Sequence, residues 1–500
     1  MLHGGRLGSV REDVAKFTSS RKDDVRLADA VLAINKAHVV MLMEQKIIQQ
    51  HDGAKILGAL AKLSSQSLDP NAEDVHMAVE EAVLAETGPD VGGNLHIAKS
   101  RNDQVTTAIR IQLRNELLNI MQKVLAMQQS LLGTASKHTQ TVILEYTHLQ
   151  PAQPVTFGHY LLSHVQALER DLERLQSAYS HINQSPLGAC AMATTSFPIN
   201  RKLTAELLGF DSVLENSIDA VGSRDFILEA QSALSLLAVN LSRFAEDLII
   251  WSSQEFGTVE LPDEFTSTSS IMPQKKNPEV LEVIRARASS TLGDFVASTA
   301  TVKSLPTTYN LDFQEVTPKL WASTDNLSAS LSIFAKLVPN LKVSGNVEGK
   351  ATAGFVGATE LANMLVRKYN VAFRTSHKIV GALVKALIDS EKTLVDATPE
   401  MLAKVALEAR GVALMVKKED IVSCTNLGKL VETHNIQGGP SPKEVERAIK
   451  NKDKSMAQTK TNISTMKNKL ETAEKTLNST VKAYSLSNSP TSVKLKNPNL

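Results

Sequence analysis

The chain has 500 residues, a formal net charge of +1 at pH 7 and two cysteines. A net charge this small gives no long-range field that would attract nucleic acid or an anionic membrane surface. No stretch reaches the roughly 18 consecutive apolar residues that a membrane span requires. Two cysteines cannot form a disulfide framework, and no apolar signal sequence opens the chain, so we expect a cytoplasmic protein.

The composition favours helices packed on helices. Hydrophobic residues make up 42% of the chain but aromatic residues only 4%, a balance that suits a helical core better than a β-sandwich. Proline is absent from three long stretches, 90–150, 199–261 and 340–398. Each stretch has room for one very long helix or for two ordinary helices.

Apolar residues recur at three- and four-residue spacing within 105–128, 160–182 and 228–251. The spacing predicts three long helices, which would pack together as a bundle. Some of these helices are apolar on more than one side, so we expect subunits to associate. Because no segment alternates with a period of two over several strands, the predicted fold class is all-α.

We expect an elongated subunit of three helical domains and a tail. Residues 1–100 form an N-terminal helical domain, 101–350 a central bundle of long helices and 351–450 a C-terminal helical domain, while 451–500 form a Lys-rich helical tail. An apolar seam within 463–484 predicts that the tail helix packs one edge against a neighbour or forms a short coiled coil. We expect activity to survive removal of the tail.

The segment 265–282 reads FTSTSSIMPQKKNPEVLE and has neither a helical nor a strand period. It combines a run of hydroxyl residues with two prolines and with Lys275 and Lys276, which rules out a regular helix and adds cationic charge. Such a segment can wrap an anionic substrate, with hydroxyl groups for proton transfer and ammonium groups for carboxylates. The alternative is a solvated basic loop on the surface.

Residues 92–110 lead from two glycines into the polar run SRNDQ at the mouth of a long helix. Arg101 offers a planar guanidinium for a carboxylate, and Asn102 offers a hydrogen-bond donor beside a helix N-terminus that favours anions. The structural alternative is an ordinary helix start capped by Asn102 or Asp103.

A third polar segment, 145–159, holds Thr147 and His148 before a Pro-containing turn, beyond which we expect a helix to resume. Histidine carries protons near neutral pH, although a lone histidine is more often structural. His76, on a predicted helix capped by Asp74 or by an earlier residue, is a weaker candidate.

A fourth polar segment, 304–315, contains Tyr309 and Gln314, but alone it predicts no more than a turn. Signatures of other chemistries are missing from the sequence. The histidines do not pair with a glutamate at metal-binding spacing, and there is no CxxC, P-loop, Rossmann fingerprint or G-x-S-x-G elbow. We therefore expect neither a metal nor a nucleotide cofactor.

Together these segments resemble the fumarase/aspartase superfamily, the fumarate-forming lyases, through the loop SIMPQKKNP. Over about residues 3–450 the chain resembles the argininosuccinate lyase family in particular. The motifs that carry this resemblance are LHIAKSRNDQ, YTHLQPAQP, SPLGACAMATTSFPI, NSIDAVGSRDF and YNLDFQE.

The resemblance implies a reversible β-elimination of argininosuccinate to L-arginine and fumarate, the last step of arginine biosynthesis. A base removes a proton from the carbon next to a carboxylate, and an acid protonates the departing nitrogen. It further implies a small-molecule substrate, no cofactor, and no nucleic-acid or membrane partner. The implied assembly is a homotetramer around twenty long helices, in which three subunits contribute to each site.

The resemblance also gives roles to single residues. Ser269 and His148 are the implied catalytic groups; we assign Ser269 as the base and His148 as the acid, and the reverse assignment remains open. Glu282 is the implied orienting partner of His148. The implied substrate-binding residues are Ser20, Arg101, Asn102, Thr147, Lys275, Asn277, Tyr309 and Gln314.

Several positions depart from the family's usual residues. Thr268 stands where the family has a glycine before the two serines, and Glu145 where it has a glycine before YTH. Thr317 replaces the lysine after the YNLDFQE tyrosine, and Lys99 replaces the arginine before SRNDQ. In an early helix, Val31 and Asn35 occupy the family's acidic and serine positions. The change at Thr317 concerns the far end of the substrate, although Lys319 lies two residues further on. Three alternatives stay open: another fumarate-releasing lyase, which the change at Thr317 supports best, an inactive structural homologue, or a helical scaffold that binds partners through its Lys-rich tail.

Overall fold

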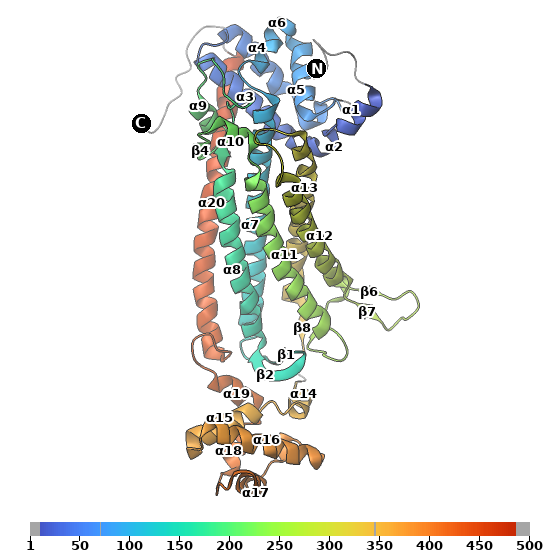
Figure 1. The fold of residues 1–500 in the computed structure, drawn as a ribbon, viewed down its shortest axis with the longest axis vertical. Coiled ribbons are helices and arrows are strands. Elements are labelled where there is room, and N and C mark those ends of the chain that lie inside the picture. The colour runs from blue at the N-terminus through green and yellow to red at the C-terminus, as the bar shows by residue number, and fades with distance from the viewer. Residues whose placement is uncertain (1–10, 71, 345–346, 487–500) are drawn as a thin grey trace.

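The computed structural model describes residues 11–70, 72–344 and 347–486. The subunit is elongated, with a group of helices at one end, a bundle of long helices in the middle and a small helical unit at the other end (Figure 1). Helices make up 71% of the structure and strands 5%, which confirms the predicted all-α class. Within the described ranges, no helix combines the length and the apolar character needed to cross a bilayer.

The three predicted long helices are present, and two more complete the bundle. The five are α7 Arg101–Lys137, α8 Phe157–Ile182, α11 Asp225–Trp251, α12 Glu279–Val302 and α13 Thr317–Leu337. Helix α7 packs against α8, α13 and several other helices, so its apolar residues are buried on more than one side. The side chains that the sequence spacing places inward, such as Leu113, Leu117 and Val124, are fully buried.

The N-terminal helices pack on the upper end of α7 (Figure 1). Their centre is α3, which buries apolar residues all round, including Ile34, Val39 and Leu42. The elements of this region are α1 Glu12–Thr18, α2 Arg21–Asp24, η1 Val25–Leu27, α3 Ala28–Glu44, α4 Gln50–Lys62, η2 Ser65–Ser67, α5 Val75–Thr87, α6 Pro89–Gly92 and η3 Gly93–His96.

Short strand pairs and helices connect the long helices. The longest pair is an antiparallel hairpin, β1 Val142–Thr147 with β2 Gln150–Thr156. The sequence predicts a turn there and a helix beyond it; the turn and α8 are present, but the two strands were not predicted. The other connecting elements are β3 Gln184–Ser185, α9 Arg201–Leu207, β4 Ser212–Val213, α10 Ser217–Gly222, β5 Val259–Glu260, η4 Asp263–Phe265, β6 Ser267–Thr268, β7 Lys276–Asn277, η5 Leu311–Glu315, η6 Val338–Asn340 and β8 Lys342–Val343.

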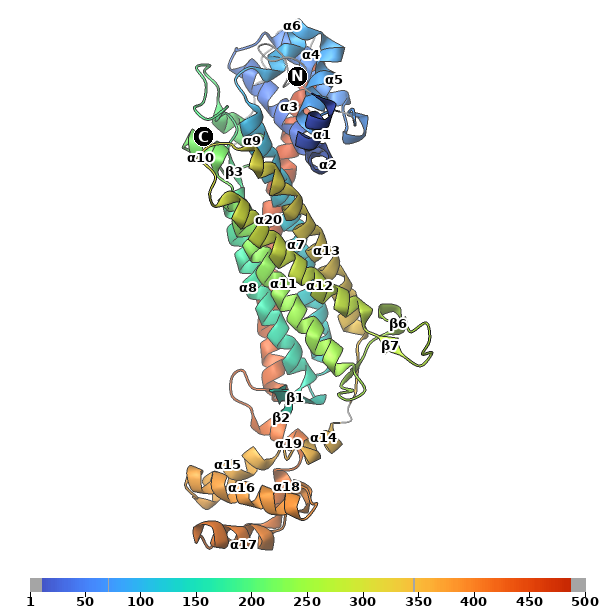
Figure 2. The same ribbon diagram turned by 45° about the vertical axis from the view of Figure 1, so that its right-hand side comes forward.

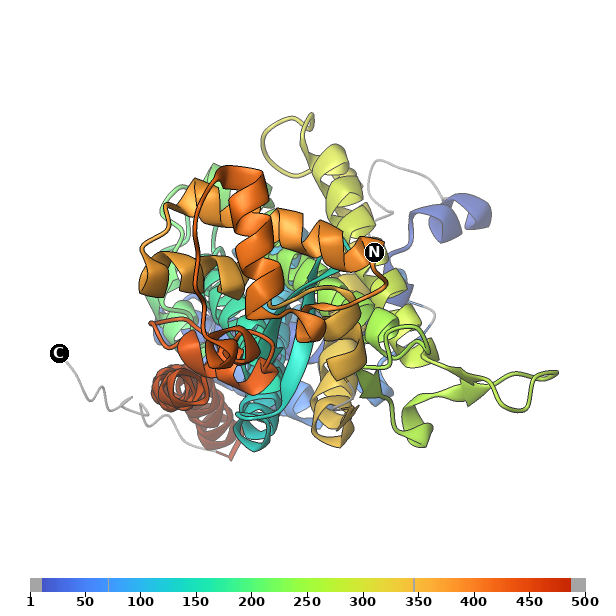
Figure 3. The same cartoon turned by 90° about the horizontal axis from the view of Figure 1, so that it is seen from below.

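The C-terminal unit has a hydrophobic core of its own, which includes Leu361, Leu365, Ile379, Leu383 and Leu402. It lies across the lower end of the bundle (Figures 2 and 3). Its elements are α14 Glu348–Ala353, α15 Ala358–Tyr369, α16 Phe373–Asp389, η7 Leu394–Asp396, α17 Pro399–Arg410, α18 Lys418–Ser423 and α19 Leu427–Thr433.

Helix α20, Pro442–Leu486, returns along the whole bundle to the N-terminal helices. Its apolar seam is buried at Ile463, Leu477 and Val481. The neighbouring helices are α7, α4, α8 and α3, so the tail helix packs one edge against a neighbour, the first of the two arrangements that the sequence predicts. The helix crosses position 450 without a break, and the division into domains stays a prediction. Residues 1–10 and 487–500, at the ends of the first and last predicted units, lie outside the described residues.

Candidate active site

The polar run SRNDQ forms the start of α7. Ser100, not Asn102 or Asp103, is the N-cap: its hydroxyl accepts the N–H of Asn102 at 3.3 Å, and its own N–H donates to Asp103 Oδ1 at 3.0 Å. The other oxygen of Asp103 accepts the N–H groups of Gly188 and Cys190 at 3.0 and 2.8 Å. Burial raises the pKa of Asp103 to about 6. This carboxyl group therefore fixes the helix start and leaves the two residues before it available for other contacts.

A cavity of about 350 Å³ opens beside this helix start. Residues from four distant segments meet there: the N-terminal helices, the start of α7, the turn before α11 and helix η5. Five of the predicted substrate-binding residues line it, namely Ser20, Arg101, Asn102, Tyr309 and Gln314. Sequence reasoning treated these residues as separate motifs, and the fold brings them into one concave site.

Several charged residues of the cavity were not predicted as site residues, and three of them bear on its chemistry. Arg224 is 1% exposed, and its guanidinium carbon lies 4.2 Å from the ring centre of Phe313. Its Nη1 donates to the carbonyl oxygens of Val221 and Ser223 at 3.0 and 2.7 Å, but Nε and Nη2 have no partner within the part of the chain that the structure describes. Burial lowers the pKa of Arg224 to about 10, so it remains a cation at neutral pH.

The other two unpredicted residues are acidic. Asp24 accepts a hydrogen bond from Ser20, and burial raises the pKa of Asp24 to about 6. Asp74 forms an ion pair with Arg101 and also caps α5 by accepting the N–H of Met77 at 2.9 Å. The four-residue interval between Ser20 and Asp24, one helical turn, was the available signal, and Arg224 belongs to the motif NSIDAVGSRDF.

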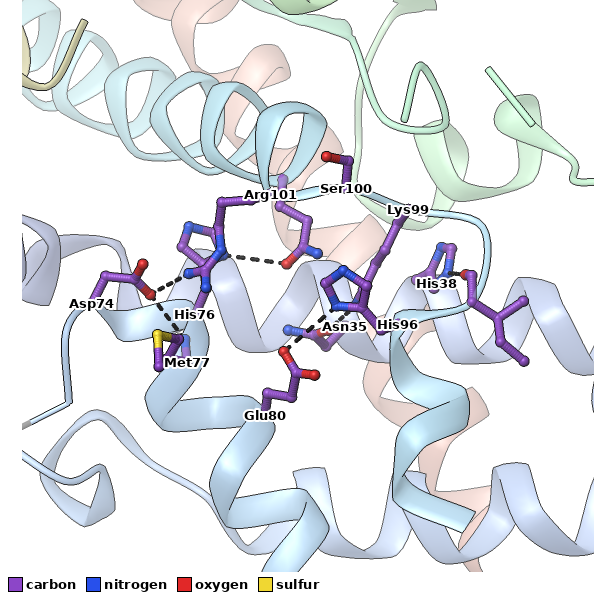
Figure 4. A network of polar contacts seen from close by, with 12 residues as sticks. Asn35, His38, Asp74, His76, Met77, Glu80, His96, Lys99, Ser100 and Arg101 are labelled. Atoms are coloured by element: carbon purple, nitrogen blue, oxygen red, sulfur yellow. Dashed lines mark hydrogen bonds and ion pairs between the residues drawn. The ribbon is translucent and has the colours of Figure 1, made fainter. Parts of the chain in front are cut away.

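A buried polar network supports the helix start from behind (Figure 4). Lys99 donates to Asn35 of α3, and burial lowers the pKa of Lys99 to about 7. His38 Nε2 lies 2.7 Å from the carbonyl oxygen of Ile97. Two of the departures from the family pattern, at Lys99 and Asn35, are thus partners in space.

His76 belongs to the same network (Figure 4). Its Nδ1 lies 3.3 Å from Oε1 of Gln104, and burial lowers its pKa to about 3. A ring that stays neutral over the physiological range is a poor proton carrier, so His76 remains the weaker candidate. As predicted, it lies on a helix capped by Asp74.

The predicted catalytic histidine lies at the tip of the β1–β2 hairpin. Thr147 pairs with Gln150, so His148 and Leu149 form a two-residue turn. Both have positive φ, 54° and 58°, as in the type I′ turn that usually requires Asn or Gly. Leu149 is poorly suited to that conformation, although histidine adopts it more often than most residues do, and such strain is concentrated at functional sites. Thr147 and His148 are exposed, and their side chains make no hydrogen bond to any described residue.

The segment 265–282 contains the strand pair β6–β7 and ends in the first turn of α12. The loop 269–275 between the two strands projects away from the bundle (Figures 1 and 3). Ser269 is half-buried directly after β6, and its Oγ accepts the N–H groups of Ile271 and Met272 at 3.3 and 3.1 Å. Lys276 pairs with Asp263 at 2.6 Å. Lys275 is exposed and forms no ion pair with the described residues, so of the two lysines it is the one available to a ligand.

The cavity and the hairpin lie at opposite ends of the bundle. Arg224 directly precedes α11, whereas Asp247, near the other end of that helix, lies close to Glu145 of β1. A helix of 27 residues spans about 40 Å, much more than one small substrate can bridge. Glu282, exposed on α12, has no hydrogen bond to His148 in the described structure. One chain therefore keeps the predicted site residues in three separate groups: cavity, hairpin and loop.

Family models and known proteins resemble this chain over most of its length. A model described as "Lyase" matches residues 9–293, and one described as "Argininosuccinate lyase C-terminal" matches 355–432. The argininosuccinate lyase of Methanococcus maripaludis strain C6 is 44% identical over 456 residues, which cover 90% of this chain and 93% of that protein. The argininosuccinate lyase of Methanosarcina barkeri is 41% identical, with 97% and 99% covered.

Solved structures agree with these relatives. An EDDS lyase in complex with formate superposes with a TM-score of 0.87 at 30% identity, with 92% of each chain covered. A class II fumarase from Schistosoma mansoni has a TM-score of 0.70 at 17% identity, with 82% of this chain and 91% of the fumarase covered. The second likeness supports the fold alone.

Proposed function

Because the chain belongs to the argininosuccinate lyase family, we propose that it is the carbon–nitrogen lyase that cleaves argininosuccinate reversibly into L-arginine and fumarate. This reaction would serve as the last step of arginine biosynthesis, and we expect it to take place in the cytoplasm. The observation that carries the proposal is the charge pattern of the cavity at the start of α7.

The cavity presents cationic and acidic groups on one small surface. Two nitrogen atoms of Arg224, Nε and Nη2, have no partner among the described residues, and Asp24 and Asp74 contribute carboxyl groups. A free amino-acid head group carries one carboxylate and one ammonium, so it needs both kinds of partner. We infer that the arginine end of argininosuccinate binds here, with its carboxylate toward Arg224 and its ammonium toward Asp24. Tyr309 and Gln314 add neutral hydrogen-bonding groups to the same surface.

The succinate end would carry the chemistry. We propose that Ser269 removes a proton from the carbon next to a carboxylate and that His148 protonates the departing guanidinium nitrogen. The negative charge that develops on the carboxylate requires cations and amides, and Lys275 and Asn277 on the loop are suited to that role. Thr147 would contact the substrate beside His148, and Glu282 would orient the imidazole. Closure of the loop would exclude water, and the Lys275 ammonium and backbone N–H groups would then stabilise the serine anion.

We propose that three chains of a homotetramer assemble each site. The separation of about 40 Å along α11 means that hairpin and cavity meet only if they come from different chains. The outer faces of α11 and α12 support such an assembly, because Leu236, Val239, Leu292 and Val296 are 42–58% exposed in a single chain. Apolar side chains at that exposure on long bundle helices are suited to pairing with other copies.

A different fumarate-releasing lyase is the second candidate. The lysine expected near the far end of the substrate is Thr317, which lines the cavity. Lys319 does not replace it, since its ammonium donates to the carbonyl oxygen of Glu315 at 2.5 Å. A cavity without that lysine could accept another amine, and the likeness to an EDDS lyase fits this alternative.

The test is a substrate panel. Purified full-length protein is mixed with argininosuccinate, and fumarate is followed by its ultraviolet absorbance, with adenylosuccinate, aspartate, malate and EDDS in parallel. We expect fumarate from argininosuccinate alone. Fumarate from another compound would assign the second candidate, and no fumarate from any of them would refute both.

A further inference from the structure

The β1–β2 hairpin contains an irregularity three residues before its catalytic tip. Glu145 pairs with Gln153, but Tyr146 pairs with Pro151, so Ala152 has no opposite residue and forms a β-bulge. Bulges bend a strand and re-aim the side chains that follow. Proline lacks an N–H to donate, so the ladder around Pro151 is weaker than in an ordinary hairpin. The orientation of the tip therefore depends on what holds the bulge.

Glu145 provides such a contact. Its Oε2 accepts the N–H of Tyr146 at 3.3 Å, across the peptide at which the register shifts. The Tyr146 ring packs on Phe256, with 5.0 Å between the ring centres. One carboxylate thus bonds the backbone at the bulge, and the next side chain is fixed by packing. Thr147 and His148 follow directly.

The groups around Glu145 do not neutralise it. From α11, Asp247 lies close enough to raise its pKa, and Arg243 interacts with Asp247. From α8, Tyr160 donates to Asp247 Oδ2 at 3.1 Å, and His164 Nε2 lies 4.0 Å from the same oxygen.

Burial lowers the pKa of His164 to about 3, so this ring is neutral. From α14, Lys350 lies over the ring of Phe256, 5.9 Å from its centre. No cation forms an ion pair with Glu145 among the described residues. Burial, followed by the like charge of Asp247, raises the pKa of Glu145 to about 7.

We propose that Glu145 is a positioning residue: by accepting the Tyr146 N–H, its carboxylate fixes the bulge that aims Thr147 and His148 into the site. A carboxylate accepts this bond better than a neutral carboxyl group does. The population of aimed hairpins therefore rises as Glu145 ionises. The inference rests on the proposed function, because it gives the hairpin tip its catalytic role.

Two variants and a control test this role through the pH dependence of turnover. Glu145→Gln keeps an oxygen acceptor but cannot ionise near neutral pH, and Glu145→Ala removes the acceptor. Glu173→Gln, on the exposed side of α8, makes the same charge change away from the hairpin. Each full-length variant is measured for kcat and KM with argininosuccinate between pH 5.5 and 8.5, about 1.5 units on either side of the Glu145 pKa.

We expect kcat of the wild type and the control to fall below pH 7 to a plateau about threefold lower, because a neutral carboxyl group still accepts the Tyr146 N–H but more weakly. Glu145→Gln should have that lower kcat at every pH. Glu145→Ala should lower kcat by about tenfold at pH 8 with KM nearly unchanged. If Glu145→Gln retains the wild-type acid limb and Glu145→Ala retains wild-type kcat, the proposal is overturned.

A second readout does not depend on turnover. Hydrogen–deuterium exchange of residues 142–156 at pH 7 reports the stability of the hairpin itself. We expect Glu145→Ala to be less protected than Glu145→Gln, because both variants lack the charge but only glutamine keeps an acceptor for the Tyr146 N–H. Equal protection in the two variants overturns the proposal even if no substrate is cleaved, whereas lower protection of Glu145→Ala without fumarate release would refute only the proposed function.

Discussion

Mixed tetramers of two inactive variants test whether the groups of one site come from different chains. His148→Asn and Ser269→Ala should each lose turnover by several orders of magnitude, because each removes a member of the proposed catalytic unit. If a site takes His148 from one chain and Ser269 from another, random mixing of the two variants leaves His148 intact in half of the sites and, independently, Ser269 intact in half of them. Half of one half is one quarter, so equal mixing should restore about 25% of wild-type activity.

The structure predicts the same result for a third group. Arg101 lies at the start of α7 beside the cavity, about 40 Å along the bundle from the hairpin. Arg101→Ala should therefore complement both other variants to about one quarter of wild-type activity. A pair of groups that came from one chain would give no active site, because every chain would carry one of the two defects.

The assay is the initial rate of fumarate release by tetramers co-expressed with two affinity tags. Native mass spectrometry would establish the proportions of mixed species. Wild type mixed with Glu173→Gln serves as the control for co-expression and should keep full activity. Verified mixed tetramers of His148→Asn and Ser269→Ala that are no more active than their parents would refute the shared site.

Four further results are expected. Leu149→Gly should raise the thermal unfolding midpoint in calorimetry, because it removes about 1 kcal/mol of left-handed backbone strain; an unchanged midpoint would contradict the strain. Arg224→Met should lower kcat/KM by at least about a hundredfold while the circular dichroism spectrum stays native. A much smaller loss of kcat/KM would refute the role of Arg224 in binding the substrate carboxylate. Deletion of 451–486 should abolish folding, because at least three buried apolar side chains are lost with it. Each contributes about 1.5–3 kcal/mol, whereas the whole free energy of unfolding is about 5–15 kcal/mol. A folded, active product would instead support the sequence-based expectation that activity survives removal of the tail. Burial raises the pKa of Glu145 from 4.5 to about 7, so the stability of the wild type should fall as the pH rises through that interval. Glu145→Gln should therefore be more stable than the wild type at pH 8, by up to about 3 kcal/mol. Equal melting midpoints of the two proteins at pH 8 would refute the burial argument.

The long helices were predictable because helical periodicity is a local property. In α7, α8 and α11 the apolar spacing runs through many turns, and the burial of residues such as Leu117 and Leu241 follows it. The hairpin was not predictable by the same rules. Pro151 and Pro154 argue against a strand, and the turn residues His148 and Leu149 lack the Asn-Gly signal of a two-residue hairpin. The strained conformation at the tip breaks the local rules, as expected at a functional site.

The site was predictable residue by residue only in part. Ser20, Arg101 and Tyr309 belong to recognisable motifs, and the fold gathers them around one cavity. Asp74 and Arg224 resemble helix-end residues in sequence, since one caps α5 and the other precedes α11. Their role depends on which distant residues they face, and no local pattern contains that information.

The departures from the family pattern also acquire their meaning in space. Lys99 and Asn35 are 64 positions apart, yet they bond to each other, so the two changed residues form one buried contact. Thr317 has no such compensation, because Lys319 is bonded to the backbone of Glu315. Among the described residues that line the cavity, the cations are then Arg101, already paired with Asp74, and Arg224. Recognition of a substrate carboxylate at this end therefore depends mainly on Arg224, which is why its substitution should affect kcat/KM more than fold.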